Sequence, residues 1–180
     1  MKRYVLLDRD GTLMHDRNYL ADPAGIEILP GVVEGLKRFQ ELGLGLVVVT
    51  NQSGVGRGYF DAAAVERVNA KLIEILSAEG IAFAGVYYCP HVDADDCRCR
   101  KPGPGMAEQA ARELGFEPGR SFVIGDRMPD LGLGRAIGAT TFLVRTGAGR
   151  RTETEHGAEA AYVVDDLVEA AVIIERLLGK

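Results

Sequence analysis

The sequence predicts an α/β fold: a three-layer, Rossmann-like domain whose central sheet is mostly parallel. Short runs rich in β-branched residues alternate along the chain with segments of helical apolar spacing. Alternation of this kind implies right-handed crossovers between parallel strands, with helices on both faces of the sheet. The 180 residues contain no repeat, low-complexity tract or long linker, and domains typically span about 100–200 residues. We therefore expect residues 1–180 to form one domain.

Six strands are expected, each a short apolar run. The most regular is LGLVVV at 44–49. Runs that are apolar without alternation are typical of strands buried on both faces. The expected strands, in chain order, cover residues 3–7, 44–49, 85–88, 121–124, 140–144 and 162–164.

Four helices are expected between or after these strands, at residues 31–42, 61–79, 106–114 and 167–178, and the segment around residues 132–138 is also expected to be helical. The longest has its valines and leucines at helical spacing on one side. Asp61 is placed to cap the amino end of this helix, and Gly80 is placed to end it. The connection at residues 146–160 is expected to be a surface loop.

The charge and hydropathy of the chain exclude several classes of protein. Hydrophobic residues make up 47% and charged residues 26%, which is close to the globular average and argues against disorder. A net charge of −5 offers no basic field for nucleic acid or an anionic membrane. No run approaches the roughly 18 apolar residues of a membrane span, and residues 4–7 are too short for a signal peptide. We expect a cytoplasmic protein with no nucleic-acid or membrane partner.

Polar motifs follow four of the expected strands, directly or through a loop. They are DRDGT at 8–12, TNQSG at 50–54, RKP at 100–102 and GDRMPD at 125–130. Ligands bind beyond the carboxyl ends of the strands in a doubly wound sheet, so carboxylates, a hydroxyl and a lysine should converge there. A carboxylate cluster suits Mg²⁺, which also binds substrate phosphate. A lysine and a threonine opposite that metal are the donors that neutralise developing phosphoryl charge.

Together and in this order, the four motifs resemble those of the haloacid dehalogenase-like (HAD-like) phosphohydrolases, over nearly the whole chain. The resemblance implies that Asp8 is the nucleophile and forms an aspartyl-phosphate. Asp10 matches the general acid and base, which protonates the leaving oxygen and then activates water. Thr50 and Lys101 match the pair that stabilises the phosphoryl group. A carboxylate nucleophile would divide phosphate-ester hydrolysis into two steps.

The same resemblance implies a catalytic Mg²⁺ held by Asp8, the backbone carbonyl of Asp10, and Asp126. Asp130 would orient Lys101 or metal-bound water. HAD-like enzymes insert cap domains that control substrate size, but residues 10–50 hold only a flap and one helix, and residues 85–101 hold only a loop. We therefore expect a capless phosphatase with an open site for a small phosphorylated substrate, and a domain of this kind can act as a monomer.

All three cysteines of the chain lie between positions 89 and 99, beside a histidine. An odd number of clustered cysteines without a secretion signal fits a metal site better than disulfides. A Cys3His set is typical of structural Zn²⁺, and four protein ligands leave no open position for catalysis. The loop 89–101 is therefore expected to bind Zn²⁺ and to hold Arg100 and Lys101 toward the site. The expected ligands are Cys89, His91, Cys97 and Cys99.

The zinc loop narrows the resemblance to one group, the heptose-bisphosphate phosphatases and the histidinol phosphatases. VVVTNQSGVGRG at 47–58, KPGPGM at 101–106 and VRTG at 144–147 are more similar to the heptose enzymes. The five-residue spacing between His91 and Cys97 is more similar to the histidinol enzymes. The resemblance implies hydrolysis of the 7-phosphate of D-glycero-D-manno-heptose 1,7-bisphosphate, with histidinol phosphate as the alternative substrate.

Charge bears on this choice of substrate and favours the bisphosphate. A bisphosphate needs cations for the phosphate that is not cleaved, and arginines at 57, 100 and 127 are available, the first among glycines that let the backbone approach a ligand closely. The cationic amine of histidinol phosphate would instead favour the acids at 93, 95 and 96. Residues 16–19 match the flap that contacts the sugar in the heptose enzymes. The full set expected to bind substrate is Arg9, Asp16, Arg17, Asn18, Tyr19, Asn51, Gln52, Ser53, Arg57, Arg100 and Arg127.

Two other classes of function share some of these features. A phosphoacceptor signalling domain also places acids, a threonine and a lysine around Mg²⁺, but its acceptor aspartate lies on a middle strand, whereas the D-x-D pair here ends the first strand. Repeated turnover, rather than one stable phosphoryl adduct, would separate the two. The glycines at 132, 134 and 138 resemble a dinucleotide-binding loop, but they lie inside an expected helix instead of a strand-to-helix turn.

Overall fold

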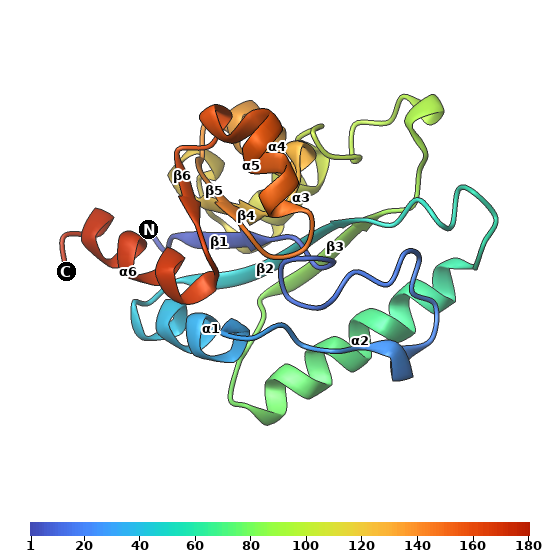
Figure 1. Cartoon of the computed structure of the whole chain (residues 1–180), viewed down its shortest axis with the longest axis horizontal. Helices are drawn as coiled ribbons and strands as arrows, with labels where there is room; N and C mark the ends of the chain where they lie inside the picture. The colour runs from blue at the N-terminus through green and yellow to red at the C-terminus, as the bar shows by residue number, and fades with distance from the viewer.

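The computed structural model describes all 180 residues, and at its centre is a six-stranded sheet in the order β3-β2-β1-β4-β5-β6 (Figure 1). Every pair of neighbouring strands is parallel. The predicted α/β class with a parallel sheet is therefore confirmed. The strands are β1 (Tyr4–Leu7), β2 (Gly45–Asn51), β3 (Gly85–Cys89), β4 (Phe122–Gly125), β5 (Thr140–Val144) and β6 (Tyr162–Val164).

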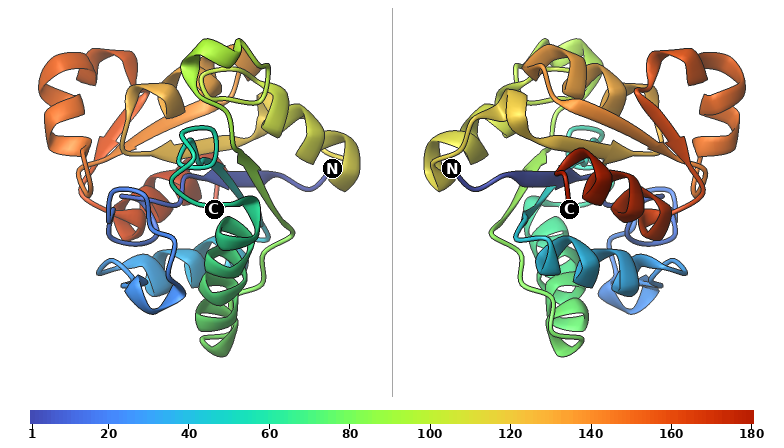
Figure 2. Two further views of the ribbon diagram at one scale, coloured as in Figure 1. Left: turned by 90° about the vertical axis from the view of Figure 1, so that its right-hand side faces the viewer. Right: turned by 90° about the vertical axis from the view of Figure 1, so that its left-hand side faces the viewer.

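Helices cover both faces of the sheet and complete the three layers. On one face lie α1 (Val32–Glu41), α2 (Ala62–Ala78) and α6 (Leu167–Leu177), and on the other lie α3 (Gly105–Leu114) and α4 (Met128–Ile137) (Figure 2). The remaining helix, α5 (Gly149–His156), connects β5 to β6. No helix combines the length and the apolar character needed to cross a membrane.

The order of the strands creates a crevice at the centre of the sheet. From β1 the chain adds β2 and β3 on one side, and then crosses back to add β4, β5 and β6 on the other. Because the direction reverses, the helices that follow β1 and β4 lie on opposite faces. Doubly wound sheets bind ligands at such a reversal, outside the carboxyl ends of the strands. Asp8 directly follows β1, and Asp126 directly follows β4.

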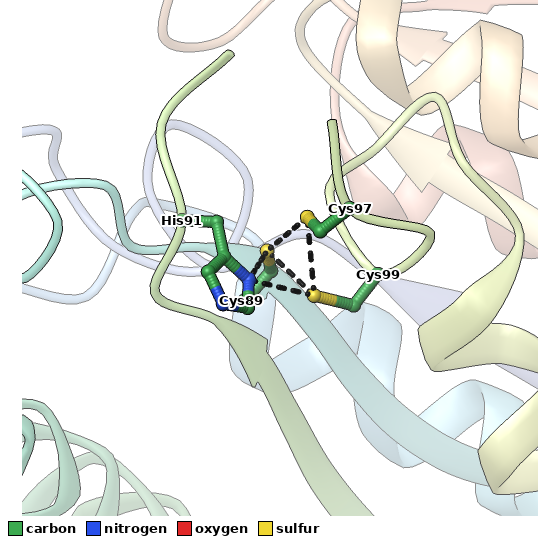
Figure 3. Close-up of side chains that lie close together, drawn as sticks. All are labelled: Cys89, His91, Cys97 and Cys99. Atoms are coloured by element: carbon green, nitrogen blue, oxygen red, sulfur yellow. Dashed lines mark hydrogen bonds between the residues drawn. The ribbon is translucent and has the colours of Figure 1, made fainter. Parts of the chain in front are cut away.

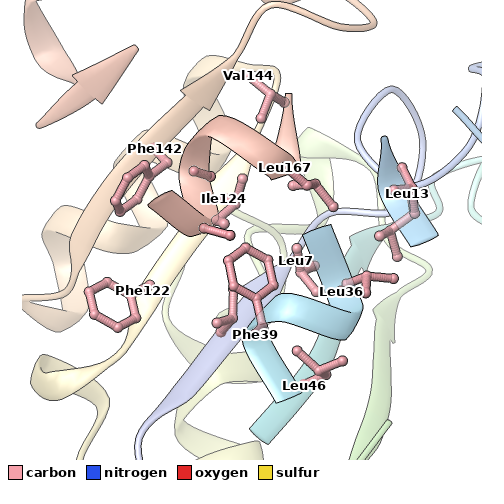
Figure 4. Packing of buried hydrophobic residues seen from close by; sticks show 14 of the residues in the cluster. Leu7, Leu13, Leu36, Phe39, Leu46, Phe122, Ile124, Phe142, Val144 and Leu167 are labelled. Atoms are coloured by element: carbon pink, nitrogen blue, oxygen red, sulfur yellow. The ribbon is translucent and has the colours of Figure 1, made fainter. Parts of the chain in front are cut away.

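The apolar core follows the alternation of side chains along the strands. In β1, Val5 and Leu7 belong to the cluster on the α1 side, and the residues between and before them belong to the cluster on the opposite side. Phe39 of α1 packs into the first cluster, where Phe122 and Phe142 meet edge to face with ring centroids 6.1 Å apart (Figure 4). Full burial of one such side chain contributes about 1.5–3 kcal/mol. The two clusters therefore hold the strand ends that carry the polar motifs.

The expected strands and helices are present, and their bounds differ from the expected ones by at most two residues; β2 runs two residues further than expected, to Asn51. The expectation of a surface loop at 146–160 is wrong, because the structure has α5 there. Polar contacts, rather than a buried apolar face, fix this helix against the rest of the protein. Thr152 Oγ1 donates to the backbone carbonyl of Asp126 at 2.8 Å, and the N–H of Ala148 donates to Asp126 Oδ2 at 2.7 Å. Contacts of this kind leave no periodic apolar pattern in the sequence.

Neither residues 10–50 nor residues 85–101 hold a cap domain, as expected. The chain between β1 and α1 contains one short 3₁₀ turn (Pro23–Gly25), and the chain between β3 and α3 contains another (Asp93–Asp95). The carboxyl edge of the sheet is therefore bordered by loops of the domain itself.

Candidate active site

A polar cavity of about 290 Å³ lies at this carboxyl edge of the sheet. A larger hollow of about 730 Å³, between α1 and α6, contains none of the expected site residues. Thr50 and Asp126 are buried beside the polar cavity. The expected site residues that line it are Asp8, Arg9, Asp10, Asp16, Asn18, Tyr19, Asn51, Gln52, Ser53, Arg57, Arg100, Lys101, Arg127 and Asp130.

The ammonium group of Lys101 lies at the centre of the site. It donates to Asp8 Oδ1 at 2.8 Å, to Asp130 Oδ1 at 2.6 Å and to the backbone carbonyl of Val49 at 2.8 Å. The Asn51 side chain holds the Lys101 backbone from both sides. Its Oδ1 accepts from the backbone N–H of Lys101 at 3.0 Å, and its Nδ2 donates to the backbone carbonyl of Lys101 at 3.1 Å. Burial alone would lower the pKa of Lys101, but Asp130 and Asp8 raise it above its ordinary range. Lys101 is therefore a fixed cation that joins β1, β2 and α4.

Three buried carboxylates, those of Asp8, Asp126 and Asp130, have oxygens that all lie within 4.8 Å of one another. Lys101 pairs with Asp8 and Asp130. In Asp126, Oδ2 accepts from a backbone N–H, whereas Oδ1 is buried and has no hydrogen-bond partner. Burial and the charges of Asp8 and Asp130 raise the pKa of Asp126. A buried carboxylate oxygen without a donor, beside two further carboxylates, fits a divalent cation such as Mg²⁺.

Two loops enclose the Asp126 carboxylate at close range. Gly11 follows β1 with a φ of 85°, and Gly147 follows β5 with a φ of 55°. A Cβ atom at either position would overlap the Asp126 carboxylate. Thr146 Oγ1 ties the loops together by donating to the Gly11 carbonyl at 2.7 Å. Only glycine fits at these two positions, because it alone adopts positive φ at no steric cost and adds no side chain.

The Asp10 carboxylate lies beside this cluster and has its own donors. It accepts from Arg9 Nε at 3.1 Å, from Arg9 Nη2 at 3.2 Å and from Gln52 Nε2 at 2.8 Å. Gln52 Nε2 also donates to Thr50 Oγ1 at 2.8 Å, so the Thr50 hydroxyl hydrogen is free for another acceptor. Burial, opposed by Arg9 and reinforced by Asp8, raises the pKa of Asp10. A carboxyl group with a raised pKa can hold a proton, as a general acid must.

Four arginines line the cavity, and three of them are paired with carboxylates. The remaining one, Arg57, has no carboxylate oxygen within 4.0 Å, and its guanidinium lies 5.9 Å from the centre of the Tyr19 ring. A cation of this kind in a cavity wall is available to an anionic group of a ligand. The three pairs are Arg9–Asp10, Arg100–Asp93 and Arg127–Asp16.

The flap (residues 16–19) is held in place by Asp16. One of its oxygens accepts from the N–H of Asn18 at 2.9 Å, and the other accepts from Arg127 Nη2 at 2.8 Å, which joins the flap to the start of α4. Asn18 and Tyr19 have positive φ values of 50° and 68°. Asparagine tolerates this conformation, but it is strained for tyrosine. The contacts of Asp16 therefore maintain a loop shape that the local sequence disfavours.

The Cys3His set meets at the carboxyl end of β3 (Figure 3). Cys89 Sγ lies 2.8 Å from Cys99 Sγ and 3.5 Å from Cys97 Sγ, and His91 Nδ1 lies 3.2 Å from Cys99 Sγ. No disulfide forms between the cysteines. The set of three sulfur atoms and one imidazole nitrogen fits a tetrahedral Zn²⁺. The N–H of Arg100 points at Cys97 Sγ at 3.4 Å, so the cysteine cluster is joined directly to the RKP motif.

Sequence reasoning missed two residues that support the site. Asn69 of α2 accepts from Arg9 Nη1 at 2.8 Å, and Thr152 of α5 holds the backbone that leads to the cavity. A polar residue among the apolar positions of an expected helix was a signal for Asn69, whereas the segment around Thr152 carried none. Conversely, Arg17 was expected to bind substrate, but the structure pairs it with Glu27 and places it outside the cavity lining.

Two family descriptions match the chain. The polynucleotide kinase 3 phosphatase family matches residues 4–131, which is more than half of the chain. The HAD-hydrolase-like family matches residues 98–170. The two matches overlap in the RKP and GDRMPD motifs and together span all four motifs.

Individual relatives match over almost their full length. A Pasteurella multocida protein named D-glycero-beta-D-manno-heptose-1,7-bisphosphate 7-phosphatase is 37% identical, over 98% of this chain and 99% of its own. A Pseudomonas aeruginosa protein of the same name is 36% identical, over 93% and 94%. The crystal structure of D,D-heptose 1,7-bisphosphate phosphatase from B. bronchiseptica, complexed with magnesium and phosphate, has a TM-score of 0.89 and 32% identity, over 97% and 98%. The corresponding Burkholderia thailandensis structure has a TM-score of 0.73 and 30% identity, over 96% and 98%.

Proposed function

The chain belongs to the HAD-like hydrolases, in the family of the D-glycero-beta-D-manno-heptose-1,7-bisphosphate 7-phosphatases, and on this basis we propose that it hydrolyses the 7-phosphate of that sugar bisphosphate. One observation carries the choice of a bisphosphate: the cavity has two separate places for an anion. Lys101 lies at the first, beside Asp8, and Thr50 is buried next to it, in contact with the cavity-lining Gln52. Arg57, without a carboxylate partner, provides the second in the cavity wall.

In the first step, an oxygen of the Asp8 carboxylate attacks phosphorus. A bond forms between this oxygen and phosphorus, and the bond from phosphorus to the sugar oxygen breaks. Asp10 gives its proton to that sugar oxygen, which leaves as an alcohol. The Lys101 ammonium, 2.8 Å from Asp8 Oδ1, holds the nucleophile in place. The Thr50 hydroxyl donates to a phosphoryl oxygen, where negative charge develops.

In the second step, Asp10 is a carboxylate and takes a proton from water. The water oxygen attacks phosphorus, the bond between Asp8 and phosphorus breaks, and inorganic phosphate leaves. Gln52 and Arg9 hold the Asp10 carboxylate during both steps. The same group therefore acts first as an acid and then as a base, which its raised pKa favours.

We assign a Mg²⁺ site to Asp8, Asp126 and the backbone carbonyl of Asp10. Asp126 Oδ1, which is buried and has no hydrogen-bond partner, supports this assignment. When bound, Mg²⁺ offsets the negative charge of the carboxylates and of the phosphoryl oxygens. Asp130 has both oxygens engaged, one with Lys101 and the other with the N–H of Arg127, so it holds the lysine in place.

We also assign a structural Zn²⁺ to Cys89, His91, Cys97 and Cys99, whose four ligand atoms lie together. We further propose that residues 1–180 act as one domain and as a cytoplasmic monomer. The cavity is lined by residues from along the whole chain between Asp8 and Asp130, and no linker interrupts the order of the elements.

Histidinol phosphate fits this cavity less well. None of the three acids that could receive its cationic amine, at 93, 95 and 96, lines the cavity. Two of them are also engaged with other groups, because Asp93 pairs with Arg100 and Asp95 accepts from the N–H of Val92. The named relatives are also heptose-bisphosphate phosphatases rather than histidinol phosphatases.

The test is the rate of phosphate release, measured as kcat/KM in the presence of Mg²⁺. The substrates are both anomers of the heptose 1,7-bisphosphate, heptose 7-phosphate and histidinol phosphate. We expect one bisphosphate anomer to exceed histidinol phosphate by a hundredfold or more, which corresponds to about 2.7 kcal/mol of transition-state discrimination. A preference for histidinol phosphate would overturn the proposed substrate and leave the phosphatase chemistry standing.

Arg57→Met tests the second anion place. The variant should lose most of the preference for the bisphosphate over heptose 7-phosphate, mainly through a higher KM, because the contact to the uncleaved phosphate persists through the reaction. Arg17→Met is the matched control, since Arg17 pairs with Glu27 outside the cavity lining. Equal preferences in the two variants would show that Arg57 does not bind the second phosphate.

A further inference from the structure

One buried position on α2 carries a polar side chain. Asn69 is 7% exposed and lies among apolar residues of the helix, with Val68 beside it and Leu72 one turn further on. Burying an amide costs free energy unless the amide is hydrogen-bonded, and asparagine is a poor helix former. Its oxygen has a defined partner, because Asn69 Oδ1 accepts from Arg9 Nη1 at 2.8 Å.

Arg9 links this helix to the reacting centre. Its side chain is 1% exposed, and it stands in the sequence between Asp8 and Asp10. Nη1 contacts Asn69, while Nε and Nη2 donate to the two oxygens of Asp10 at 3.1 and 3.2 Å. The guanidinium is planar and rigid. When Nη1 is held by Asn69, the positions of Nε and Nη2, which face Asp10, are therefore also fixed.

The direction of the Asp10 carboxyl group matters for its proposed chemistry. A general acid must lie within about 2.6–3.2 Å of the oxygen that it protonates. Gln52 holds only Oδ2 of Asp10, and Oδ1 has its contact from Arg9. Without the Asn69 oxygen, the buried Nη1 of Arg9 loses its acceptor, and one of the contacts that fix the orientation of the guanidinium is lost.

We propose that Asn69 is a positioning residue that acts through Arg9 to aim the Asp10 carboxyl group at the leaving oxygen. The proposal rests on the proposed function, which makes Asp10 the general acid. Asn69 does not line the cavity, so it acts on the reaction only through its neighbour.

The test compares two leaving groups. The alkoxide of the heptose bisphosphate is a poor leaving group and needs the proton of Asp10, whereas the nitrophenolate of 4-nitrophenyl phosphate departs without it. The value of kcat/KM covers the steps up to the aspartyl-phosphate, so the later role of Asp10 as a base does not enter. The ratio of the two kcat/KM values within one preparation is independent of the fraction of enzyme that is folded, so partial unfolding of a variant does not obscure the result.

Four variants are compared with the unchanged protein. Asn69→Leu removes the acceptor at similar volume, and Asn69→Asp retains an acceptor at the same place. Val68→Ala disturbs the packing of α2 next to Asn69 without removing a contact to Arg9. Asp10→Asn removes the acid itself and shows the full effect of its loss on the ratio.

We expect Asn69→Leu to lower kcat/KM for the heptose bisphosphate by about tenfold or more, and for 4-nitrophenyl phosphate by less than about threefold. Asn69→Asp and Val68→Ala should keep the ratio of the unchanged protein. If Asp10→Asn changes the ratio and Asn69→Leu does not, the positioning role is overturned and the proposed function stands. The positioning role is also overturned if Asn69→Asp loses as much as Asn69→Leu. If Asp10→Asn leaves the ratio unchanged, the acid role of Asp10 fails, and the positioning role fails with it.

A second background separates action through Arg9 from a general effect on the fold. In an Arg9→Met protein, Asn69→Leu should cause no further change in the ratio, because the intermediary is already absent. A further change of about tenfold in that background would overturn the proposed route through Arg9.

Discussion

At the level of single residues, the proposed chemistry depends first on Asp8, whose carboxylate lies at the end of β1 against the Lys101 ammonium. Asp8→Asn should abolish turnover of the heptose bisphosphate, because an amide cannot form the acyl-phosphate intermediate. Phosphate release over many enzyme equivalents measures this. Asp61→Asn is the matched control: Asp61 caps α2 through the N–H of Ala64, and asparagine caps equally well, so its activity should be unchanged. Activity above the uncatalysed background in Asp8→Asn would contradict the assignment of the nucleophile.

Lys101 stabilises the fold as well as the reacting groups, because it neutralises two buried carboxylates. Lys101→Met leaves the buried carboxylates of Asp8 and Asp130 without their cation, and breaking a buried ion pair in this way costs about 3–5 kcal/mol. We therefore expect a loss of unfolding free energy of this order in urea, with part of it recovered on addition of Mg²⁺, which offsets the same charges.

Lys71→Met is the control for Lys101→Met. Lys71 pairs with Glu74 on the surface of α2, and exposed pairs contribute about 0–1 kcal/mol. Equal stability of the two variants in metal-free buffer would show that Lys101 does not neutralise the cluster.

At the level of elements, α5 holds the backbone of Asp126 through Thr152, which its polar composition does not suggest. Thr152→Val removes the hydroxyl that donates to the Asp126 carbonyl at almost unchanged volume. A buried acceptor left without a donor costs about 1–3 kcal/mol of unfolding free energy. Because the same contact positions Asp126, the concentration of Mg²⁺ needed for half-maximal activity should also rise.

Thr154→Val provides the comparison within the same helix. Its hydroxyl donates at 3.0 Å to the carbonyl of Arg150, in an exposed position. This variant should keep both the stability and the Mg²⁺ requirement. A normal Mg²⁺ requirement in Thr152→Val would restrict the role of that residue to holding α5.

The loop at residues 89–101, which carries the Cys3His set, is the second element whose role can be tested. Removal of the proposed Zn²⁺ with a chelator should lower the Tm by more than about 4 °C and reduce turnover, because the loop runs directly into Arg100 and Lys101. Metal analysis before and after treatment establishes the zinc content, and Mg²⁺ is restored before the assay. Full activity in protein verified to be free of zinc would show that the loop needs no metal.

The elements themselves were largely predictable. The apolar runs and the helical spacings were sufficient for β1 to β6 and for α1, α2, α3 and α6, because each of these elements buries one or both of its faces. For α4, only a helical segment around residues 132–138 was expected, without bounds. The exception was α5, in which only Gly149 and Thr152 are buried. A helix held by polar contacts to a distant loop has no apolar stripe, so its local sequence does not distinguish it from a loop.

At the level of the whole molecule, the reversal of strand order between β1 and β4 brings the motifs together. Lys101 meets Asp8 across 93 positions of the chain and meets Asp130 across 29. The flap is tied to Arg127 across 111 positions. The larger apolar cluster, on the α1 side of the sheet, keeps the strand ends at fixed separations, so the site has its geometry without an added cap domain.

The sequence by itself determined the class of the fold, the four motifs and the cysteine and histidine set. These features are recorded locally: a buried strand requires a run of apolar residues, and a motif places its reactive side chains directly after such a run. For the same reason, the order of the motifs along the chain was sufficient to indicate the resemblance to the HAD-like phosphohydrolases, and the relatives confirm it.

The tertiary structure alone decided which of these side chains are free and which are already engaged. Arg17 forms an ion pair with Glu27, and Arg100 forms an ion pair with Asp93. Arg57 has no carboxylate partner and lies near the Tyr19 ring. It also paired Arg9 with Asn69 across 60 positions. The physical reason is that a charged or polar group takes the partner that packing brings within about 3 Å. That partner belongs to another element, whose position follows from the packing of the whole core rather than from the residues on either side.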